Sequence, residues 1–182
     1  HRLNRRQRQM CIRDRKKTIA YHEAGHATVS WMLEHANPLV KVTIVPRGRS
    51  LGAAWYLPEE RSLNTTEQIL DEMCAALGGR AAESIIFNKI STGALSDLEK
   101  VTKQAMAMVT IYGLDEKIGN ISYYDSQNQG YGFTKPYSEE TAKIIDQEIK
   151  KITDGQYERA KAILKNHEDK LHMLANKLLE TE

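Results

Sequence analysis

The first third of the chain predicts a helix followed by two short strands. Apolar residues recur at helical spacing over 18–35 and form a wide apolar face that ends near Pro38. Residues 39–46 then alternate apolar and polar side chains, which predicts a strand. Residues 51–58 are apolar and end at Pro58, which is typical of an edge strand because proline donates no hydrogen bond to a ladder. We therefore expect one small sheet.

Helices dominate the middle of the chain. Thr65 followed by Gln68 is typical of a capping box, and it predicts a helix over 65–77 that stops at the two glycines after it. Residues 80–89 continue as a separate helical piece. A glycine-containing turn then leads into a segment whose apolar positions repeat at helical spacing, so we expect a long helix over 95–112.

The last third predicts a loop and two helices. Residues 119–137 are rich in Gly, Asn, Ser and Tyr and lack periodicity, so we expect a loop there. Ser138 is a good cap for the next helix, and a break near Asn166 separates that helix from the last one. The expected fold is therefore mainly α with a small β-sheet (α+β), ending in a C-terminal helical hairpin.

The composition indicates a folded globular domain. The chain has 182 residues, of which 41% are hydrophobic and 27% charged, and these proportions do not fit a disordered chain. No run approaches the roughly 18 consecutive apolar residues that span a bilayer, so we expect this fragment to be soluble. The two cysteines are far apart and form no CxxC pair, which excludes a cysteine zinc cluster.

Charge is unevenly distributed along the chain. Residues 1–17 hold six Arg, two Lys and one Asp, a charge of +7, whereas the whole chain carries +2, which leaves −5 on residues 18–182. We divide the chain into a basic N-terminal arm, 1–15, expected to be disordered or extraneous, and one domain over 16–182. Because the arm has no aromatic residue on which a base could stack, we expect no nucleic-acid partner.

The strongest chemical signal is the pentapeptide HEAGH, residues 22–26, inside the first predicted helix. Positions i and i+4 share one face of a helix, so His22 and His26 can bind the same metal ion. Glu23 projects beside these ligands, where it can take a proton from water activated by the metal. The spacing therefore predicts two zinc ligands and a general base, and the chemistry it implies is hydrolysis of a peptide bond.

A catalytic zinc site also needs a third protein ligand. Asp97 follows a glycine-containing turn at the start of a predicted helix, and Glu83 lies in the helical piece before it. Each also has a structural explanation, since an acidic residue at a helix N-terminus complements the helix dipole and Glu83 could pair with an arginine. No carboxylate or glycine context marks the histidines 35, 167 and 172. Spacing alone does not choose between Asp97 and Glu83.

The order of these motifs resembles the peptidase domain of the FtsH family of membrane-anchored, ATP-dependent AAA zinc metalloproteases, peptidase family M41. The resemblance runs from about residue 16 to 179 and rests on the segments AYHEAGHA, VTIVPRG, LGAAWYLPEE, GGRAAE, STGALSDLEKVT and MVTIYGL. It implies one Zn²⁺ per chain held by His22, His26 and Asp97, with Glu23 as general base. Glu83 then becomes a supporting acid rather than a ligand.

The same resemblance implies a larger assembly. Members of the family form a hexameric protease ring below an AAA ATPase ring and degrade unfolded, damaged or membrane proteins. This chain has no GxxxxGKT phosphate loop, so ATP would act only through the AAA ATPase domain of a parent chain, and the membrane would be reached only through anchors outside this fragment. The implied location is the cytoplasmic face of the bacterial inner membrane, or the organelle interior if the parent is organellar. One alternative is a catalytically inactive homologue that acts as an assembly scaffold, and a less favoured one is a nucleic-acid or membrane-surface binder that uses the basic N-terminal arm.

The predicted edge strand suggests how an unfolded polypeptide binds. A substrate could add to it as a further strand, with main-chain hydrogen bonds that depend little on sequence. The expected substrate-binding residues are Gly52, Ala53, Ala54, Trp55, Tyr56 and Leu57.

Overall fold

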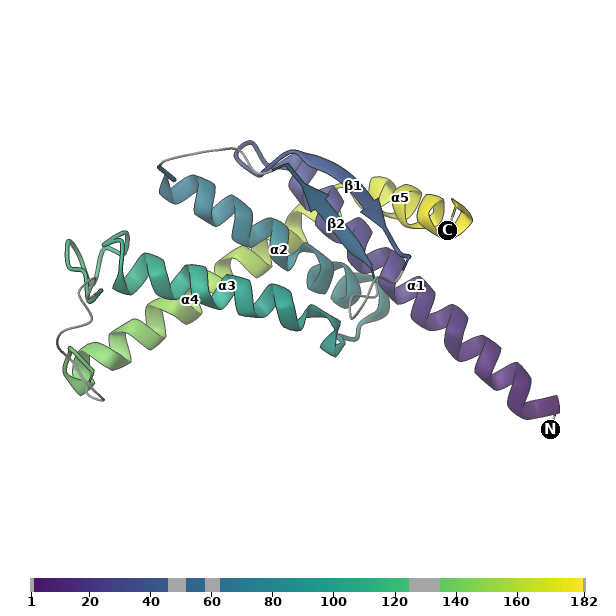
Figure 1. Cartoon of the computed structure of the whole chain (residues 1–182), viewed down its shortest axis with the longest axis horizontal. Coiled ribbons are helices and arrows are strands. Elements are labelled where there is room, and N and C mark those ends of the chain that lie inside the picture. The colour runs from purple at the N-terminus through teal and green to yellow at the C-terminus, as the bar shows by residue number, and fades with distance from the viewer. Residues whose placement is uncertain (1, 46–51, 58–62, 125–134, 182) are drawn as a thin grey trace.

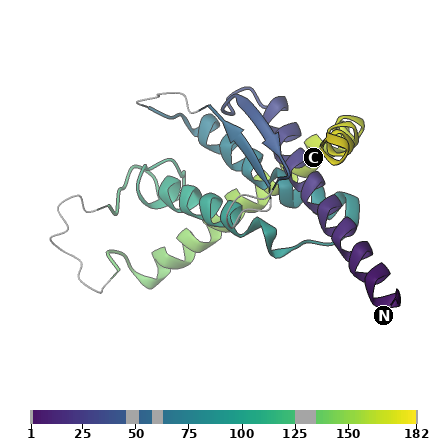
Figure 2. The same ribbon diagram turned by 45° about the vertical axis from the view of Figure 1, so that its right-hand side comes forward.

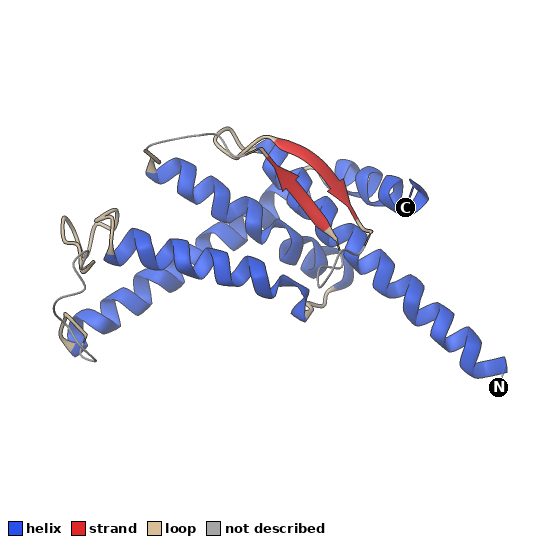
Figure 3. Ribbon diagram, viewed as in Figure 1, coloured by secondary structure: helices blue, strands red, loops and turns tan. Residues whose placement is uncertain are grey.

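The structure is a computed structural model that describes residues 2–45, 52–57, 63–124 and 135–181, with the side chains of 2–13 outside the description. The elements are α1 (Arg2–Met32), β1 (Leu39–Thr43), β2 (Ala53–Tyr56), α2 (Thr66–Phe87), a 3₁₀ turn (Thr92–Ala94), α3 (Leu95–Thr110), α4 (Glu139–Asn166) and α5 (Glu168–Thr181). This confirms the expected class, mainly α with a small β-sheet (Figure 3). No helix in the described ranges has the length and apolar character that crossing a membrane requires.

Helix α2 lies at the centre of the fold. It packs against α1, α3 and α4, while α5 lies along α1 and the two strands cross over α1 (Figure 1). The buried apolar side chains between these helices form one main core, with members such as Val29, Met73 and Leu164 fully buried. A chain of this length buries enough apolar surface on such a core to hold its helices in place. The helices that carry the candidate site are therefore held in place by this core.

Helix α1 is longer than expected. It begins at Arg2 rather than near residue 18, and its N-terminal turns project from the body (Figure 2). The segment 1–15 was expected to be disordered or extraneous. From residue 2 onward, it forms the first turns of this helix. The division of the chain between residues 15 and 16 stays a prediction.

The expected end of a helix at Gly78 and Gly79 is wrong. Helix α2 runs through both glycines, from the capping box that Thr65 and Gln68 form to Asn88 in the left-handed conformation. The glycines serve close packing instead, since a Cβ added at Gly78 would lie 2.7 Å from the carbonyl oxygen of Gly25 on α1. A Cβ on Gly25 would in turn lie 2.4 Å from the Gly78 carbonyl oxygen. Two helices that approach this closely leave no room for side chains at either glycine.

The two strands pair antiparallel and confirm the small sheet. Thr43 pairs with Ala53 and Val42 with Ala54, and the register is irregular before Lys41. The expected alternation fails at this irregularity: Val40 is 65% exposed, whereas Thr43 is buried. The outer residues of the predicted strands, 46, 51 and 58, lie outside the described residues.

The C-terminal helices do not form the expected hairpin. The break falls at residue 167, as the sequence predicted, but α4 packs against α2 and α3 while α5 packs against α1. Their apolar faces therefore meet different partners instead of each other. The Tyr21 hydroxyl lies 2.6 Å from Nδ1 of His172 and ties α5 to α1. Residues 119–124 and 135–137 have no helix or strand, as expected for a loop, and 125–134 lie outside the described residues.

Candidate metal centre

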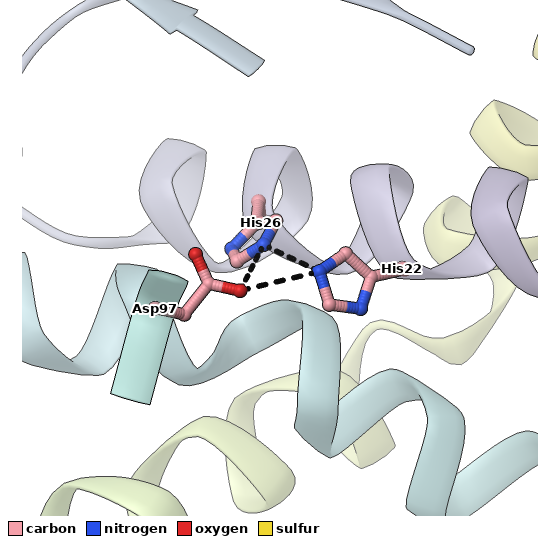
Figure 4. Close-up of side chains that lie close together, drawn as sticks. All are labelled: His22, His26 and Asp97. Carbon is pink, nitrogen blue, oxygen red and sulfur yellow. Dashed lines mark hydrogen bonds and ion pairs between the residues drawn. The ribbon is translucent and has the colours of Figure 1, made fainter. Parts of the chain in front are cut away.

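The structure brings His22, His26 and Asp97 together. The two histidines stand one turn apart on α1, and Asp97 reaches them from the first turn of α3 (Figure 4). Their Nε2 atoms lie 3.0 Å apart. Oδ2 of Asp97 is 3.3 Å from Nε2 of His22 and 3.4 Å from Nε2 of His26. Three potential ligand atoms therefore converge from two helices, and both imidazoles are buried.

The hydrogen bonds behind the imidazoles determine which nitrogens face the centre. Nδ1 of His26 lies 2.9 Å from the Ala75 carbonyl oxygen, and a carbonyl only accepts, so this nitrogen carries the hydrogen. Nδ1 of His22 lies 2.7 Å from Oε1 of Glu83, which is likewise an acceptor when ionised. In neutral imidazoles both Nε2 atoms are then lone-pair acceptors. Partners of this kind orient metal-binding histidines.

This donor set fits a zinc ion. Zinc–nitrogen and zinc–oxygen bonds of about 2.0–2.1 Å place the ligands of a tetrahedral site about 3.3 Å from one another. The three distances of 3.0, 3.3 and 3.4 Å are close to that spacing. Two lone pairs and a carboxylate oxygen facing one another repel unless a cation lies between them. A proton on one of these atoms can be hydrogen-bonded to another, whereas a metal ion can bind all three at once.

The electrostatics of the site favour positive charge. Burial alone would lower the pKa of His22, but hydrogen bonds to Asp97 and Glu83 outweigh it and raise that pKa to about 9. Burial would likewise raise the pKa of the Asp97 carboxyl, but its bonds to His22 and His26 hold that pKa well below its usual range. Asp97 is therefore an anion at neutral pH, as a zinc ligand must be.

Glu23 lies beside the histidines and is also buried. Burial raises the pKa of its carboxyl, and protonated forms of the neighbouring His26 and His22 would oppose that rise. Gly52, the residue just before β2, approaches it closely: a Cβ added at Gly52 would lie 2.7 Å from Oε1 of Glu23. The carboxylate is thus held between α1 and the edge strand, on the cleft side of the site.

Glu83 occupies a different place from the one a third ligand needs. It is 2% exposed and contacts Nδ1 of His22, on the far side of the ring from the Nε2 atom that faces Asp97. Its carboxylate also accepts hydrogen bonds from Ser91. The geometry therefore places Asp97, and not Glu83, with the two Nε2 atoms.

A cleft of about 890 Å³ contains this centre. Four of the six residues expected to bind substrate line it, namely Gly52, Ala53, Ala54 and Tyr56. The other two do not: Trp55 is 50% and Leu57 59% exposed, outside the cleft. Neighbouring residues of a strand point to opposite faces, which separates Trp55 from Ala54 and Tyr56.

Sequence reasoning missed Gly79 of α2. A Cβ there would lie 2.6 Å from Nε2 of His22 and 2.6 Å from Nε2 of His26. The two imidazole rings occupy the space that a side chain at position 79 would need. Helix-forming residues on both sides of the glycine pair were the available signal, because a glycine kept inside a helix needs a packing reason.

Comparison with known proteins finds relatives that are named as proteases. The chain is 64% identical over 169 residues to the ATP-dependent zinc metalloprotease FtsH of Parabacteroides distasonis, which covers 93% of this chain and 25% of that protein. It is 50% identical over 170 residues to the mitochondrial inner membrane m-AAA protease component AFG3L2 of Mus musculus, covering 93% of this chain and 21% of the relative. The chain thus spans about a fifth to a quarter of the length of these curated relatives.

The profile of peptidase family M41 matches residues 9–182, nearly the whole chain. The match includes the HEAGH helix, the glycine pair of α2 and the start of α3, which together build the centre. It also confirms the resemblance drawn from the sequence motifs. The chain therefore belongs to peptidase family M41.

Proposed function

We propose that this chain is a zinc endopeptidase domain that hydrolyses peptide bonds of unfolded, damaged or membrane proteins. The observation that carries the proposal is the convergence of two imidazole Nε2 atoms and one carboxylate oxygen at 3.0–3.4 Å, with both Nδ1 atoms already engaged. Family membership supports it, since relatives are named zinc metalloproteases.

His22, His26 and Asp97 are the proposed ligands of one zinc ion, and Glu23 is the proposed catalytic base. Zinc held there supplies Lewis-acid activation of water and of the scissile carbonyl. Glu23 accepts the proton of the attacking water and returns it to the departing amine. A buried carboxylate with a raised pKa suits this exchange, because it binds the proton readily and also releases it.

Substrate binding is proposed along β2. One edge of this strand pairs with β1, and residues of β2 line the cleft beside Glu23. An extended polypeptide added to the other edge, which pairs with no strand among the described residues, would pass the metal centre with its main chain held by hydrogen bonds. Such binding depends little on side chains, which suits a protease that degrades many unfolded proteins.

The remaining machinery is proposed to lie in a longer parent protein. The relatives are named ATP-dependent, and one is named as an inner-membrane component. We propose that ATP acts through an AAA ATPase domain of the parent chain, that six copies form a ring, and that anchors outside this fragment attach it to the membrane. The location would be the cytoplasmic face of the bacterial inner membrane, or the organelle interior in an organellar parent.

Metal removal tests the proposal directly. We expect one zinc per chain by elemental analysis, cleavage of an unfolded protein such as casein, loss of that cleavage on dialysis against a chelator, and its return with added Zn²⁺. Cleavage that survives complete removal of zinc would contradict the assigned chemistry. A chain that binds no zinc after reconstitution would contradict the metal site itself.

Proline at position 54 tests the edge strand. We expect Ala54→Pro to raise KM for an unfolded peptide several-fold, about 1 kcal/mol of binding, while zinc content stays at the parental level, because proline removes a main-chain donor. Peptides N-methylated at single backbone amides provide the matched test on the substrate side, and alternate positions should matter most. Unchanged KM in both experiments would contradict strand addition.

Alanine at position 79 tests the close packing of the centre. A methyl group 2.6 Å from both Nε2 atoms must displace the imidazoles, so we expect Gly79→Ala to bind zinc at least about tenfold more weakly. Gly155→Ala is the control, because Gly155 lies inside α4 with no atom within 4 Å of an added Cβ. That variant should keep zinc affinity and gain about 0.5–1 kcal/mol of stability. Equal zinc affinity in the parent and Gly79→Ala would contradict the packing argument.

A further inference from the structure

The ligands of the proposed centre come from two helices that scarcely touch each other. His22 and His26 lie on α1 and Asp97 on α3, and both helices pack against α2. A tetrahedral site requires its ligand atoms to be placed closely, so something must fix the start of α3 relative to α1. The contacts that α2 makes with α1 and with the segment before α3 show how this position is fixed.

Glu83 of α2 bridges the two sides. Its Oε1 lies 2.7 Å from Nδ1 of His22 and accepts a hydrogen bond of 3.1 Å from the Ser91 hydroxyl. Its Oε2 accepts a hydrogen bond of 2.7 Å from the Ser91 backbone N–H. One buried carboxylate therefore orients a proposed ligand on α1 and holds the segment that leads into α3.

Ser91 passes this restraint on to Asp97. Its hydroxyl oxygen also accepts from the Gly93 backbone N–H at 3.1 Å, which caps the 3₁₀ turn Thr92–Ala94. That turn continues directly into α3, where Asp97 is the third residue. Between Ser91 and Asp97 the backbone is helical throughout, so the position of the cap sets the position of the carboxylate.

We propose that Ser91 is a positioning residue of the zinc site: its hydroxyl joins Glu83 to the start of α3 and so brings Asp97 to the two histidines. The inference rests on the proposed function, because it concerns how that metal site is assembled. Ser91 itself contacts none of the three ligand atoms, and we propose no part for it in the reaction.

Zinc affinity of the chain and its Ser91 variants tests this role, with competition against a chromophoric chelator as the measurement. Loss of a hydrogen-bonding partner behind a ligand commonly weakens metal binding 10–100-fold, so we expect about a tenfold loss in Ser91→Ala and less than about threefold in Ser91→Thr, which keeps the hydroxyl. Cobalt(II) in place of zinc gives a second readout: its visible absorption bands should change in Ser91→Ala and stay parental in Ser91→Thr.

Ser138→Ala is the matched control. Ser138 caps α4, where its hydroxyl accepts from the Thr141 N–H at 3.2 Å, and it has no contact with Glu83. This variant loses a helix cap of the same kind, so its thermal stability should fall while its zinc affinity and cobalt spectrum stay parental. A loss of zinc affinity in Ser138→Ala equal to that in Ser91→Ala would overturn the inference, since general destabilisation would then explain both.

The double variant Glu83→Gln with Ser91→Ala tests the route of the effect. If Ser91 acts through Glu83, the double variant should lose less affinity than the product of the two single losses. Unchanged affinity in Ser91→Ala, or fully multiplicative losses, would overturn the inference. Absence of zinc from the parent would overturn the proposed function itself, and that result is seen before any substitution is made.

Discussion

Glu23→Gln is expected to abolish peptide cleavage while leaving zinc bound. Glutamine has the size of glutamate but accepts no proton at neutral pH, and a positioned general base contributes about 10²–10⁴-fold to rate. We therefore expect kcat for an unfolded peptide to fall about 10³-fold. Zinc per chain should stay at the parental value, because Glu23 supplies none of the three converging ligand atoms.

The design of this experiment separates the base from the ligands. Glu99→Gln is the control, since Glu99 is exposed on α3, pairs with Lys103 and makes no contact with the centre. Both variants are compared by elemental analysis and by single-turnover cleavage, which excludes product release from the measured rate. Turnover of Glu23→Gln within about tenfold of the parent would contradict the role of Glu23 as general base.

The histidine pair was predictable because its geometry is local. A separation of four residues fixes two side chains on one face of a helix, whatever the rest of the fold does. The structure places the Nε2 atoms of His22 and His26 3.0 Å apart, as that spacing implies. The pairing of two short strands and the capping box of Thr65 also follow from local patterns.

Residues that meet across the fold were not predictable in this way. Spacing left Asp97 and Glu83 as equal candidates, because nothing local shows which side of the His22 ring each carboxylate reaches. The Ala75 carbonyl that orients His26 belongs to the backbone and leaves no trace in side-chain patterns. The glycines of α2 were interpreted by their usual effect, helix termination, whereas here they allow close contact with α1.

The C-terminal helices show a related limit. Apolar periodicity shows that each helix has a face to bury, but it does not name the partner that covers the face. Helix α5 buries Leu171 and Ala175 while packing along α1, and α4 faces α2 and α3, so two helices adjacent in sequence separate in space. Helices that are neighbours in sequence commonly pack against each other as a hairpin, but here α5 packs against α1 instead.

Asp97→Ala is expected to remove most zinc binding. Loss of a supporting partner already weakens metal sites by 10–100-fold, so loss of one of three direct ligands should weaken zinc affinity by more than about a hundredfold. Competition with a chelator measures the affinity, and Glu99→Ala, two residues further along the same helix, is the matched control. The zinc affinity of the Glu99→Ala variant should remain that of the parent.

The comparison with Glu83→Ala distinguishes the two carboxylates that the sequence left open. Glu83 contacts Nδ1 of His22 and Ser91, so its removal should weaken zinc binding about 10–100-fold, less than the loss of Asp97. The hydrogen bonds to His22 and His26 that hold the Asp97 pKa low also mark it as the anion that faces the centre. The reverse order, with zinc lost in Glu83→Ala and retained in Asp97→Ala, would make Glu83 the third ligand, and His22 would then have to bind through Nδ1.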